Sequence, residues 1–256
     1  MTADHVSRLP LRRAICAALF LMLTSLPLSS QTMQRFGDMR ISLLGGAGYT
    51  LGTGEFQTVC ACSFLSGPGG FGAYAGMSVS YAYNEVLSGA VRVSYIGIPA
   101  VYQNESEFIR YNQDGSQTVT RFRREATFTL GAGAIALLAE WRGLVDNLTL
   151  SVGPEAMITV SDKYHEQEDI IAGPGAYAST GTRTLLLADG DVSDTFAFNR
   201  FTIGMLLLAS YELPLDGRLS ITPEIGWHLQ FTTMLQDFSS LRLMPLRAGV
   251  GVTLRL

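Results

Sequence analysis

Eight acidic, basic or cationic side chains are spaced so that they should point toward a common interior. They alternate with apolar residues, and successive side chains of a strand point to opposite faces. The candidates for this interior network are Arg92, Arg123, Glu125, Glu155, Arg200, Glu224, His228 and Arg247. Arginine and glutamate can satisfy each other by charge-assisted hydrogen bonds, whereas isolated charges in a narrow interior would be costly. We interpret the set as a structural network of salt bridges, with a small ion or proton path as the alternative.

A catalytic site would need a histidine near a nucleophile and an orienting acid. Beyond residue 30 the chain has only His165 and His228, and neither lies in a recognisable catalytic pattern. His165 stands among Glu166, Glu168 and Asp169, which is more typical of a solvated acidic loop than of a metal site. We therefore expect no catalytic residues, no metal and no cofactor. A lipid-modifying enzyme acting at the rim is the alternative.

Cys60 and Cys62 form a second candidate pair. Export to an oxidising compartment would allow a disulfide between them. Residues two apart in an extended chain lie near or beyond the usual Cα separation of a disulfide, so closure requires a tight turn. The open alternatives are a loop disulfide and unpaired or intermolecular thiols. Two thiols without a nearby histidine make an incomplete metal site.

Long alternating strands must position these residues. In residues 219–232 the odd positions include Ile225, Trp227 and Leu229, whereas the even positions include Glu224 and His228. One face of this strand is apolar and the other polar, as in a membrane-spanning barrel that is apolar outside and polar inside. The same alternation predicts eight strands, at 40–51, 71–83, 90–98, 121–139, 148–162, 198–213, 219–232 and 245–256.

Two of these strands contain a proline one residue before an inward glutamate. Pro154 precedes Glu155, and Pro223 precedes Glu224. Because proline removes a ladder hydrogen bond, each position suggests a bulge or kink that helps to close the barrel. Coincidence between two similar strands is the alternative.

The connections between the expected strands alternate in length. Short turns are expected at 84–88, 142–147 and 214–217, and long loops at 52–70, 99–120, 163–197 and 233–244. Short periplasmic turns and longer extracellular loops are the asymmetry of outer-membrane barrels. A soluble ligand-binding barrel, which would bury its apolar face inward, is the rival fold.

The N-terminus has the order of a secretory signal peptide. Arg8, Arg12 and Arg13 precede a short apolar stretch, and small residues follow up to Ser30, near which we expect cleavage. Residues 1–30 are thus the signal peptide, 31–38 a short periplasmic segment and 39–256 the barrel. Removing residues 1–30, which carry a net charge of +2, changes the net charge from −4 to −6. That balance argues against a nucleic-acid partner.

With its leader, its eight alternating strands and a last strand that ends at Leu256, the chain resembles small outer-membrane β-barrel proteins of the OmpA-transmembrane, OmpX-like and PorT-like group. The resemblance rests on pattern and covers residues 38–256. It implies location in the outer membrane of a Gram-negative-type bacterium, contact with membrane lipid, and insertion by the outer-membrane assembly machinery through the last strand. For function we expect a structural or surface-interaction barrel, with a narrow transport or secretion-accessory barrel as the alternative.

Overall fold

The computed structural model describes residues 36–53, 69–112, 114, 116–143, 145–235 and 241–256. Strands account for most of them, and α2 (Val192–Thr195) is a single short helical turn. Among these residues, no helix is long and apolar enough to cross a membrane. The strands are β1 (Met39–Thr53), β2 (Phe71–Ala82), β3 (Leu87–Tyr111), β4 (Gln117–Arg142), β5 (Leu148–Ala172), β6 (Thr184–Asp191), β7 (Phe201–Tyr211), β8 (Leu213–Pro214), β9 (Leu219–Gln230) and β10 (Arg242–Arg255).

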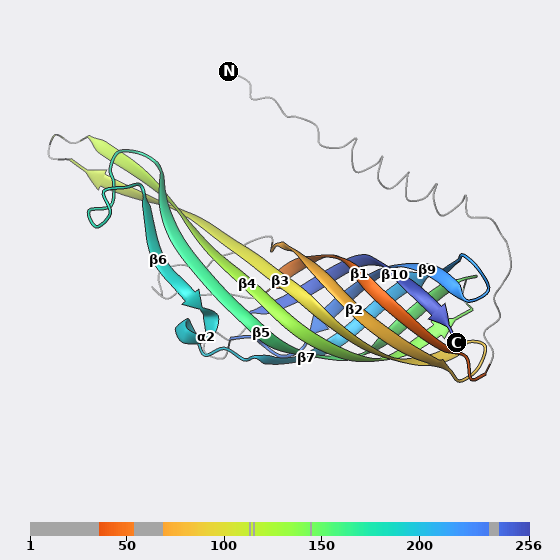
Figure 1. Ribbon diagram of the computed structural model, residues 1–256. Helices are drawn as coiled ribbons and strands as arrows, with labels where there is room; N and C mark the ends of the chain where they lie inside the picture. The colour runs from red at the N-terminus through yellow and green to blue at the C-terminus, as the bar shows by residue number, and fades with distance from the viewer. Residues whose placement is uncertain (1–35, 54–68, 113, 115, 144, 236–240) are drawn as a thin grey trace, which may run out of the picture. The chain divides into compact units, whose positions relative to one another are not determined.

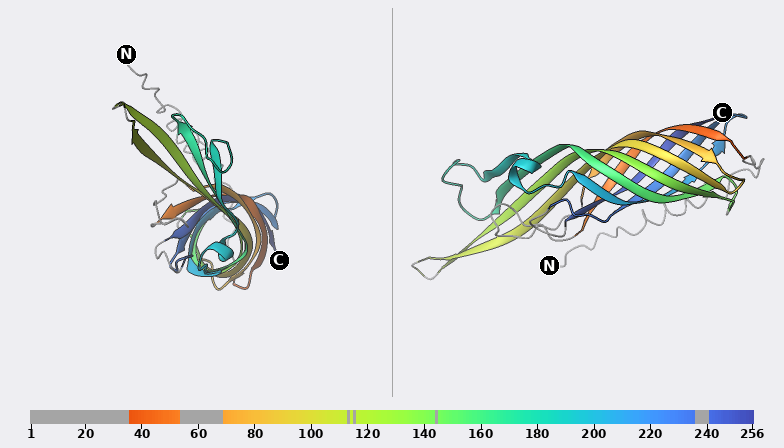
Figure 2. Two further views of the ribbon diagram at one scale, coloured as in Figure 1. Left: turned by 90° about the vertical axis from the view of Figure 1, so that its left-hand side faces the viewer. Right: turned by 90° about the horizontal axis from the view of Figure 1, so that it is seen from below.

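Eight of these strands close into an antiparallel ring (Figures 1 and 2). The order around the ring is β10-β1-β2-β3-β4-β5-β7-β9, and β9 pairs again with β10. The remaining strands, β6 and β8, each add to one neighbour, β5 and β9 respectively. Closure leaves the ring itself without an unpaired edge. The sequence-based prediction of an eight-stranded antiparallel barrel is confirmed.

The outer face of the ring is an apolar band. Ile135 on β4, Val160 on β5 and Val250 on β10 are each half or more exposed, whereas inward residues of the same strands are buried. Aromatic pairs flank the band. Tyr49 and Phe71 lie 4.8 Å apart between ring centroids at one end, and Tyr81 and Tyr83 lie 5.5 Å apart at the other. An apolar band between aromatic girdles is the architecture of a transmembrane barrel.

Short turns gather at one end of the ring, here called the turn end, together with the first and last described residues. Asn84 and Asp216 each shape a turn, because each carboxamide or carboxylate oxygen accepts hydrogen bonds from two backbone N–H groups further along the chain. Asn147 adopts a left-handed conformation, with φ of 62°, in the turn between β4 and β5. The opposite end is called the loop end.

Three strands continue past the loop end of the ring (Figure 1). β3, β4 and β5 contain 25, 26 and 25 residues, or about 80 Å each at the usual rise. The β3–β4 ladder runs without interruption to the pair between Tyr111 and Gln117. The prediction that 99–120 and 163–197 are loops is therefore wrong in large part: both contain paired strands. Their polar residues lie on both faces because water surrounds them, so the alternation that marks the membrane band is lost.

The bulges lie elsewhere than the prolines suggested. Pairing keeps its register through Pro154, opposite Met205, and through Pro223, opposite Val250. The register shifts instead between β4 and β5, where Ile171 and Val160 of β5 are skipped, and between β5 and β6, where Leu187 is skipped. The predicted bulges at the prolines are thus wrong, although the β4–β5 ladder lacks its pairs at Gly153 and Pro154. A missing ladder bond at proline does not require an extra residue in the strand.

Candidate functional site

Glu155 on β5 is the centre of the first polar layer inside the ring. Arg247 on β10 donates two hydrogen bonds to its carboxylate, at 3.0 and 2.8 Å, and His228 Nδ1 on β9 donates a third at 2.6 Å. All three side chains are at most 2% exposed. The bidentate fork satisfies both carboxylate oxygens, which a buried charge requires.

Glu224 on β9 is the centre of a second layer. Arg92 on β3 forms a bidentate salt bridge with it, with one N–O distance of 2.9 Å, and the Tyr74 hydroxyl on β2 donates at 2.8 Å. The Arg92 guanidinium also lies 5.9 Å from the centroid of the Tyr74 ring, within the range of a cation–π contact. Side chains from three strands therefore meet across the interior.

Glu212, directly after β7, is the centre of a third layer at the turn end. Three arginines contact its carboxylate, Arg40 at 3.3 Å, Arg142 at 3.1 Å and Arg255 at 3.4 Å. The Ser220 hydroxyl donates a further hydrogen bond at 3.1 Å. This layer connects the first and last strands of the ring, since Arg40 lies on β1 and Arg255 on β10.

A small cavity of about 50 Å³ lies between the second and third layers. Arg40, Arg92, Glu212 and Glu224 line it together with a set of serine and threonine hydroxyls, and Glu140 on β4 also faces it. No described residue hydrogen-bonds the buried Oε2 of Glu140. The described residues contain no group of three or more His, Cys, Asp or Glu placed to hold a metal ion.

Glycines make room for the largest interior groups. A Cβ on Gly204 would lie 2.6 Å from His228 Nε2 and 2.3 Å from the carbonyl oxygen of Leu229. A Cβ on Gly249 would lie 2.2 Å from the Tyr74 hydroxyl. Glycine at these two places is therefore a packing requirement of the imidazole and the phenol.

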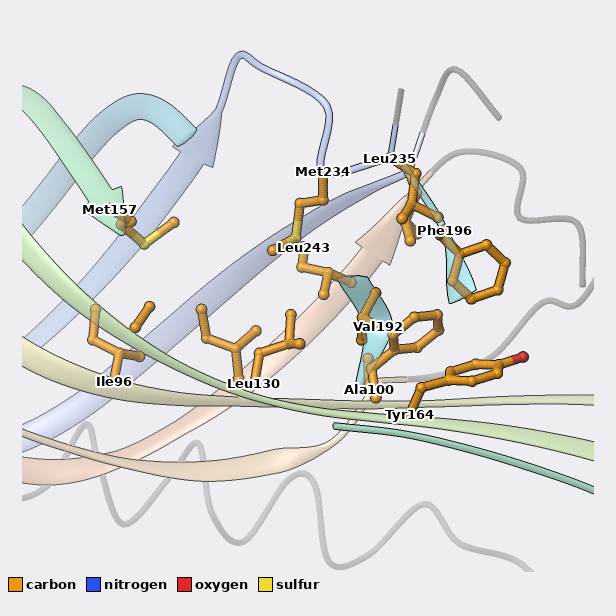
Figure 3. Packing of buried hydrophobic residues seen from close by; sticks show 14 of the residues in the cluster. Ile96, Ala100, Leu130, Met157, Tyr164, Val192, Phe196, Met234, Leu235 and Leu243 are labelled. Atoms are coloured by element: carbon orange, nitrogen blue, oxygen red, sulfur yellow. The ribbon is translucent and has the colours of Figure 1, made fainter. Parts of the chain in front are cut away.

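The interior toward the loop end is apolar, which corrects the expectation of a lumen filled by polar and charged groups throughout. β3 and β4 place Ile96, Ile98 and Leu130 inward, because these strands are apolar on both faces there. Figure 3 shows Val192 and Phe196, from α2 and the residue after it, beside Tyr164. Met234, Leu235 and Leu243 pack into the same cluster. Loop segments and strands together thus close this half.

Three of the eight candidate residues lie outside the network. Arg123 pairs with Glu105 at 2.8 Å, and Glu125 accepts a hydrogen bond from Gln103, both in exposed positions on the extended β3–β4 hairpin. Arg200, whose side chain is 58% exposed, contacts Asp162 at the loop end. The expected face of 121–139 is inverted: on β4 the even-numbered residues such as Ala126 and Phe128 point inward, so Arg123 and Glu125 lie on the outward face. Arg200 directly precedes β7 at the loop end, where its side chain is open to water. The structure places the other five, Arg92, Glu155, Glu224, His228 and Arg247, in the interior.

Two further predictions concern the loops. Cys60 and Cys62 lie outside the described residues. His165 is on the extended part of β5, where its Nδ1 lies 3.3 Å from Asp189 in an exposed position. Nearby, the Asp191 carboxylate accepts a hydrogen bond from Lys163 at 2.6 Å, which raises the pKa of that amine.

Sequence reasoning missed several members of the network. Tyr74 carries no charge that would single it out, Glu140 directly follows the expected strand 121–139, and Arg142 begins the expected turn 142–147. Glu212 stands between Tyr211 and Leu213, near the end of the expected strand 198–213. The continuing alternation from Gly204 through Ser210 to Glu212 is the signal that could have found it.

Comparisons with known proteins find distant structural likenesses only. No protein-family model and no curated protein matches the chain. Among solved structures, the outer membrane protein AlkL has 10% identity and a TM-score of 0.41, over 91% of this chain and 95% of that one. Ail, the attachment invasion locus protein of Yersinia pestis, has 10% identity and a TM-score of 0.36, over 85% and 99%. OprG from Pseudomonas aeruginosa has 7% identity and a TM-score of 0.35, over 86% and 97%. No functional statement follows from likenesses this distant.

The closed ring of strands, its apolar outer band and the buried ion pairs inside it define the class of protein without reference to any relative. The chain is a small transmembrane β-barrel of the outer-membrane kind, because only a closed ring satisfies every backbone group of strands that cross a bilayer. Its interior layers cross-link strands that are distant in the sequence, from β1 to β10. Chemically they hold charges in fixed pairs.

Proposed function

We propose that this chain is a non-conducting outer-membrane barrel of structural or surface-interaction type. Its turn end faces the periplasm, and the extensions of β3, β4 and β5 with β6 face the exterior. Membrane lipid covers the apolar band, and the assembly machinery of the outer membrane inserts the chain through β10. We assign it no catalytic role and no cofactor.

The filled interior is the observation that carries this proposal. Glu155 and Glu224 each hold an arginine bidentately across the lumen, and the apolar cluster around Phe128 and Leu243 closes the loop end. Eight strands enclose a space just wide enough for side chains. A solute would have to displace buried ion pairs as well as packed apolar groups.

Planar-bilayer recording of the purified, folded barrel tests the proposal. The expected result is a current no larger than that of the bare bilayer at neutral pH. As a matched pair, Glu155→Ala and Glu105→Ala each remove one salt-bridged carboxylate, the first inside the ring and the second on the exposed hairpin. A steady conductance of the wild type that Glu155→Ala changes and Glu105→Ala does not would refute the proposal in favour of transport.

A narrow transport or secretion-accessory barrel is the second candidate. It is favoured by the way the loop end is closed, since Val192, Phe196 and Leu235 come from connections and could move aside without opening the ring. Asp162 accepts hydrogen bonds from the Ser193 backbone N–H and from Arg200, and so fastens this closure to β5. Conductance or solute uptake that appears in Asp162→Ala, but not in the wild type, would identify a closed transport barrel.

The extensions beyond the ring support the surface role. Phe108, Tyr111 and Leu186 are more than half exposed there, although water would surround them. Exposed apolar groups on a protruding sheet are typical of an interaction surface. Replacing Phe108 and Tyr111 by serine should reduce attachment of cells to the surface they bind, whereas barrel assembly should be unchanged. Unaltered attachment would argue for a purely structural barrel.

A further inference from the structure

A shallow groove of about 540 Å³ lies in the outer wall of the ring. Its outward lining residues belong to two neighbouring hydrogen-bonded rows that cross the strands from β3 to β10. One row contains Leu87, Trp141, Leu150, Ala209 and Ile225, and the next contains Ala139, Val152, Leu207, Trp227 and Leu246.

Small residues set among large ones produce the hollow. Ala139 and Ala209 stand where the surrounding outward positions hold leucine, isoleucine, valine or tryptophan. Trp141 and Trp227 rise beside them, with 57% and 38% of their surfaces exposed. A second hollow of about 450 Å³, lined by residues of β2, β3 and β4 such as Val79, Val91 and Leu137, contains neither of these alanines and no tryptophan. The volume of the groove beside the two alanines lies within the range of small-molecule sites.

The location of the groove decides its occupant. It lies in the apolar band, toward the turn end, because Leu87 begins β3 and Trp141 is one residue from the end of β4. Hydrocarbon chains cover this band in a bilayer. None of the described lining residues is basic, so nothing there selects a phosphate headgroup. The rows are also inclined to the membrane plane, since barrel strands tilt about 35–45°. A chain can therefore lie along them.

We propose that the groove is a binding site for one acyl chain of a phospholipid in the leaflet at the turn end, held more tightly than the surrounding lipid. This inference rests on the membrane location given above. The two alanines provide the space, and the two indoles provide flat apolar walls.

The fluorescence of the protein reports on this site directly, because the chain has two tryptophans and both line the groove. Delipidated barrel in detergent is titrated with a phospholipid whose acyl chains are brominated, a quencher of indole. The wild type should show saturable quenching near one lipid per barrel. Ala209→Leu fills the groove and should weaken the apparent affinity at least fivefold. Ala248→Leu is the control, since Ala248 pairs with Ile225 in the same row but lies outside the groove.

Native mass spectrometry of the same samples gives an independent readout. One retained phospholipid is expected on the wild type and on Ala248→Leu, and none on Ala209→Leu. Ala139→Leu replaces Ala209→Leu if the latter does not fold. Quenching that rises linearly with lipid and is equal in all variants would overturn the inference. So would a concentration-dependent dimer that Ala209→Leu abolishes, since a second copy would then occupy the groove. Slower gel migration after heating shows beforehand that each sample is a folded barrel, so failure of the lipid site is distinct from failure of the membrane assignment.

Discussion

Glu155 is a fully buried carboxylate that compensates a buried cation. Its carboxylate compensates the buried Arg247 cation and holds the His228 ring. Removing one partner of a buried ion pair leaves the other charge buried without compensation. The free-energy cost of that uncompensated charge is far larger than the net stabilisation that the intact pair provides. The exposed pair of Arg123 and Glu105 has the same chemistry, but water screens it.

Glu155→Ala should therefore lower the free energy of unfolding by about 3–5 kcal/mol, whereas Glu105→Ala should change it by about 0–1 kcal/mol. Urea unfolding of the barrel in lipid vesicles, followed by tryptophan fluorescence, measures both. Equal effects of the two substitutions would contradict the assignment of Glu155 to a closed interior network.

Gly204→Ala tests the packing of His228. The new methyl group would lie within 2.6 Å of both the imidazole and the Leu229 carbonyl oxygen, so the ring or the strand must shift. We expect a loss of about 1–3 kcal/mol, as for other overpacked interiors. Gly133→Ala is the matched control, since nothing lies within 4 Å of its Cβ position. A neutral Gly204→Ala variant would show that His228 does not pack against β7.

At the scale of the elements, the alternation in the sequence located the strands but not their ends. Within the bilayer, lipid outside and a closed interior impose opposite polarity on the two faces, so Ile225 and Glu224 are distinguishable from sequence. Past the loop end, both faces meet water and the pattern disappears, although the ladder from Pro99 to Tyr111 continues. Arg123 and Glu125 were predicted wrongly because the apolar even-numbered face of β4, which includes Ala126 and Phe128, packs into the interior and does not face lipid. Glu212 lies inside the expected strand 198–213, at an even position like the inward Gly204.

Removal of the extended hairpin should leave the ring intact. We expect that replacing residues 103–125 by a short Gly-Ser turn preserves heat-modifiable gel migration, because Tyr102 and Ala126, both buried, remain to cap the interior. The pair of Arg123 with Glu105 is lost with it, as are the ion pairs of Arg124 with Glu166 and Glu168 on the extended part of β5. None of these pairs belongs to the three polar layers inside the ring. A truncated chain that no longer forms a heat-modifiable barrel would show that the extension is part of the folding unit.

The turn between β8 and β9 should give a pH-dependent contribution to stability. Hydrogen bonds from the backbone N–H groups of Arg218 and Leu219 lower the pKa of Asp216 below its ordinary value of about 3.9. Its contribution is therefore present above that value and disappears as the pH falls through the lowered pKa. The free energies of unfolding of the wild type and Asp216→Asn should differ at pH 7 and converge as the pH falls through this lowered pKa. A difference that grows on acidification would contradict this.

At the scale of the whole molecule, two different sets of side chains fill the interior of the ring, one in each half. Polar layers cross-link the turn-end half, from Arg40 on β1 to Arg255 on β10, and an apolar cluster fills the loop-end half. Sequence analysis foresaw the first, because charges at alternating positions are visible one strand at a time. It did not foresee the second. That cluster combines two-sided apolar strands with loop residues such as Val192 and Leu235, whose meeting depends on tertiary structure.

The central claim is that this ring stands in the outer membrane with its apolar band in lipid. The most direct measurement is fractionation of cells that produce the full chain, followed by gel electrophoresis of each fraction with and without heating. We expect the protein in the outer-membrane fraction, with a different gel migration after heating, because heating unfolds the barrel. Recovery as a soluble periplasmic monomer would contradict it.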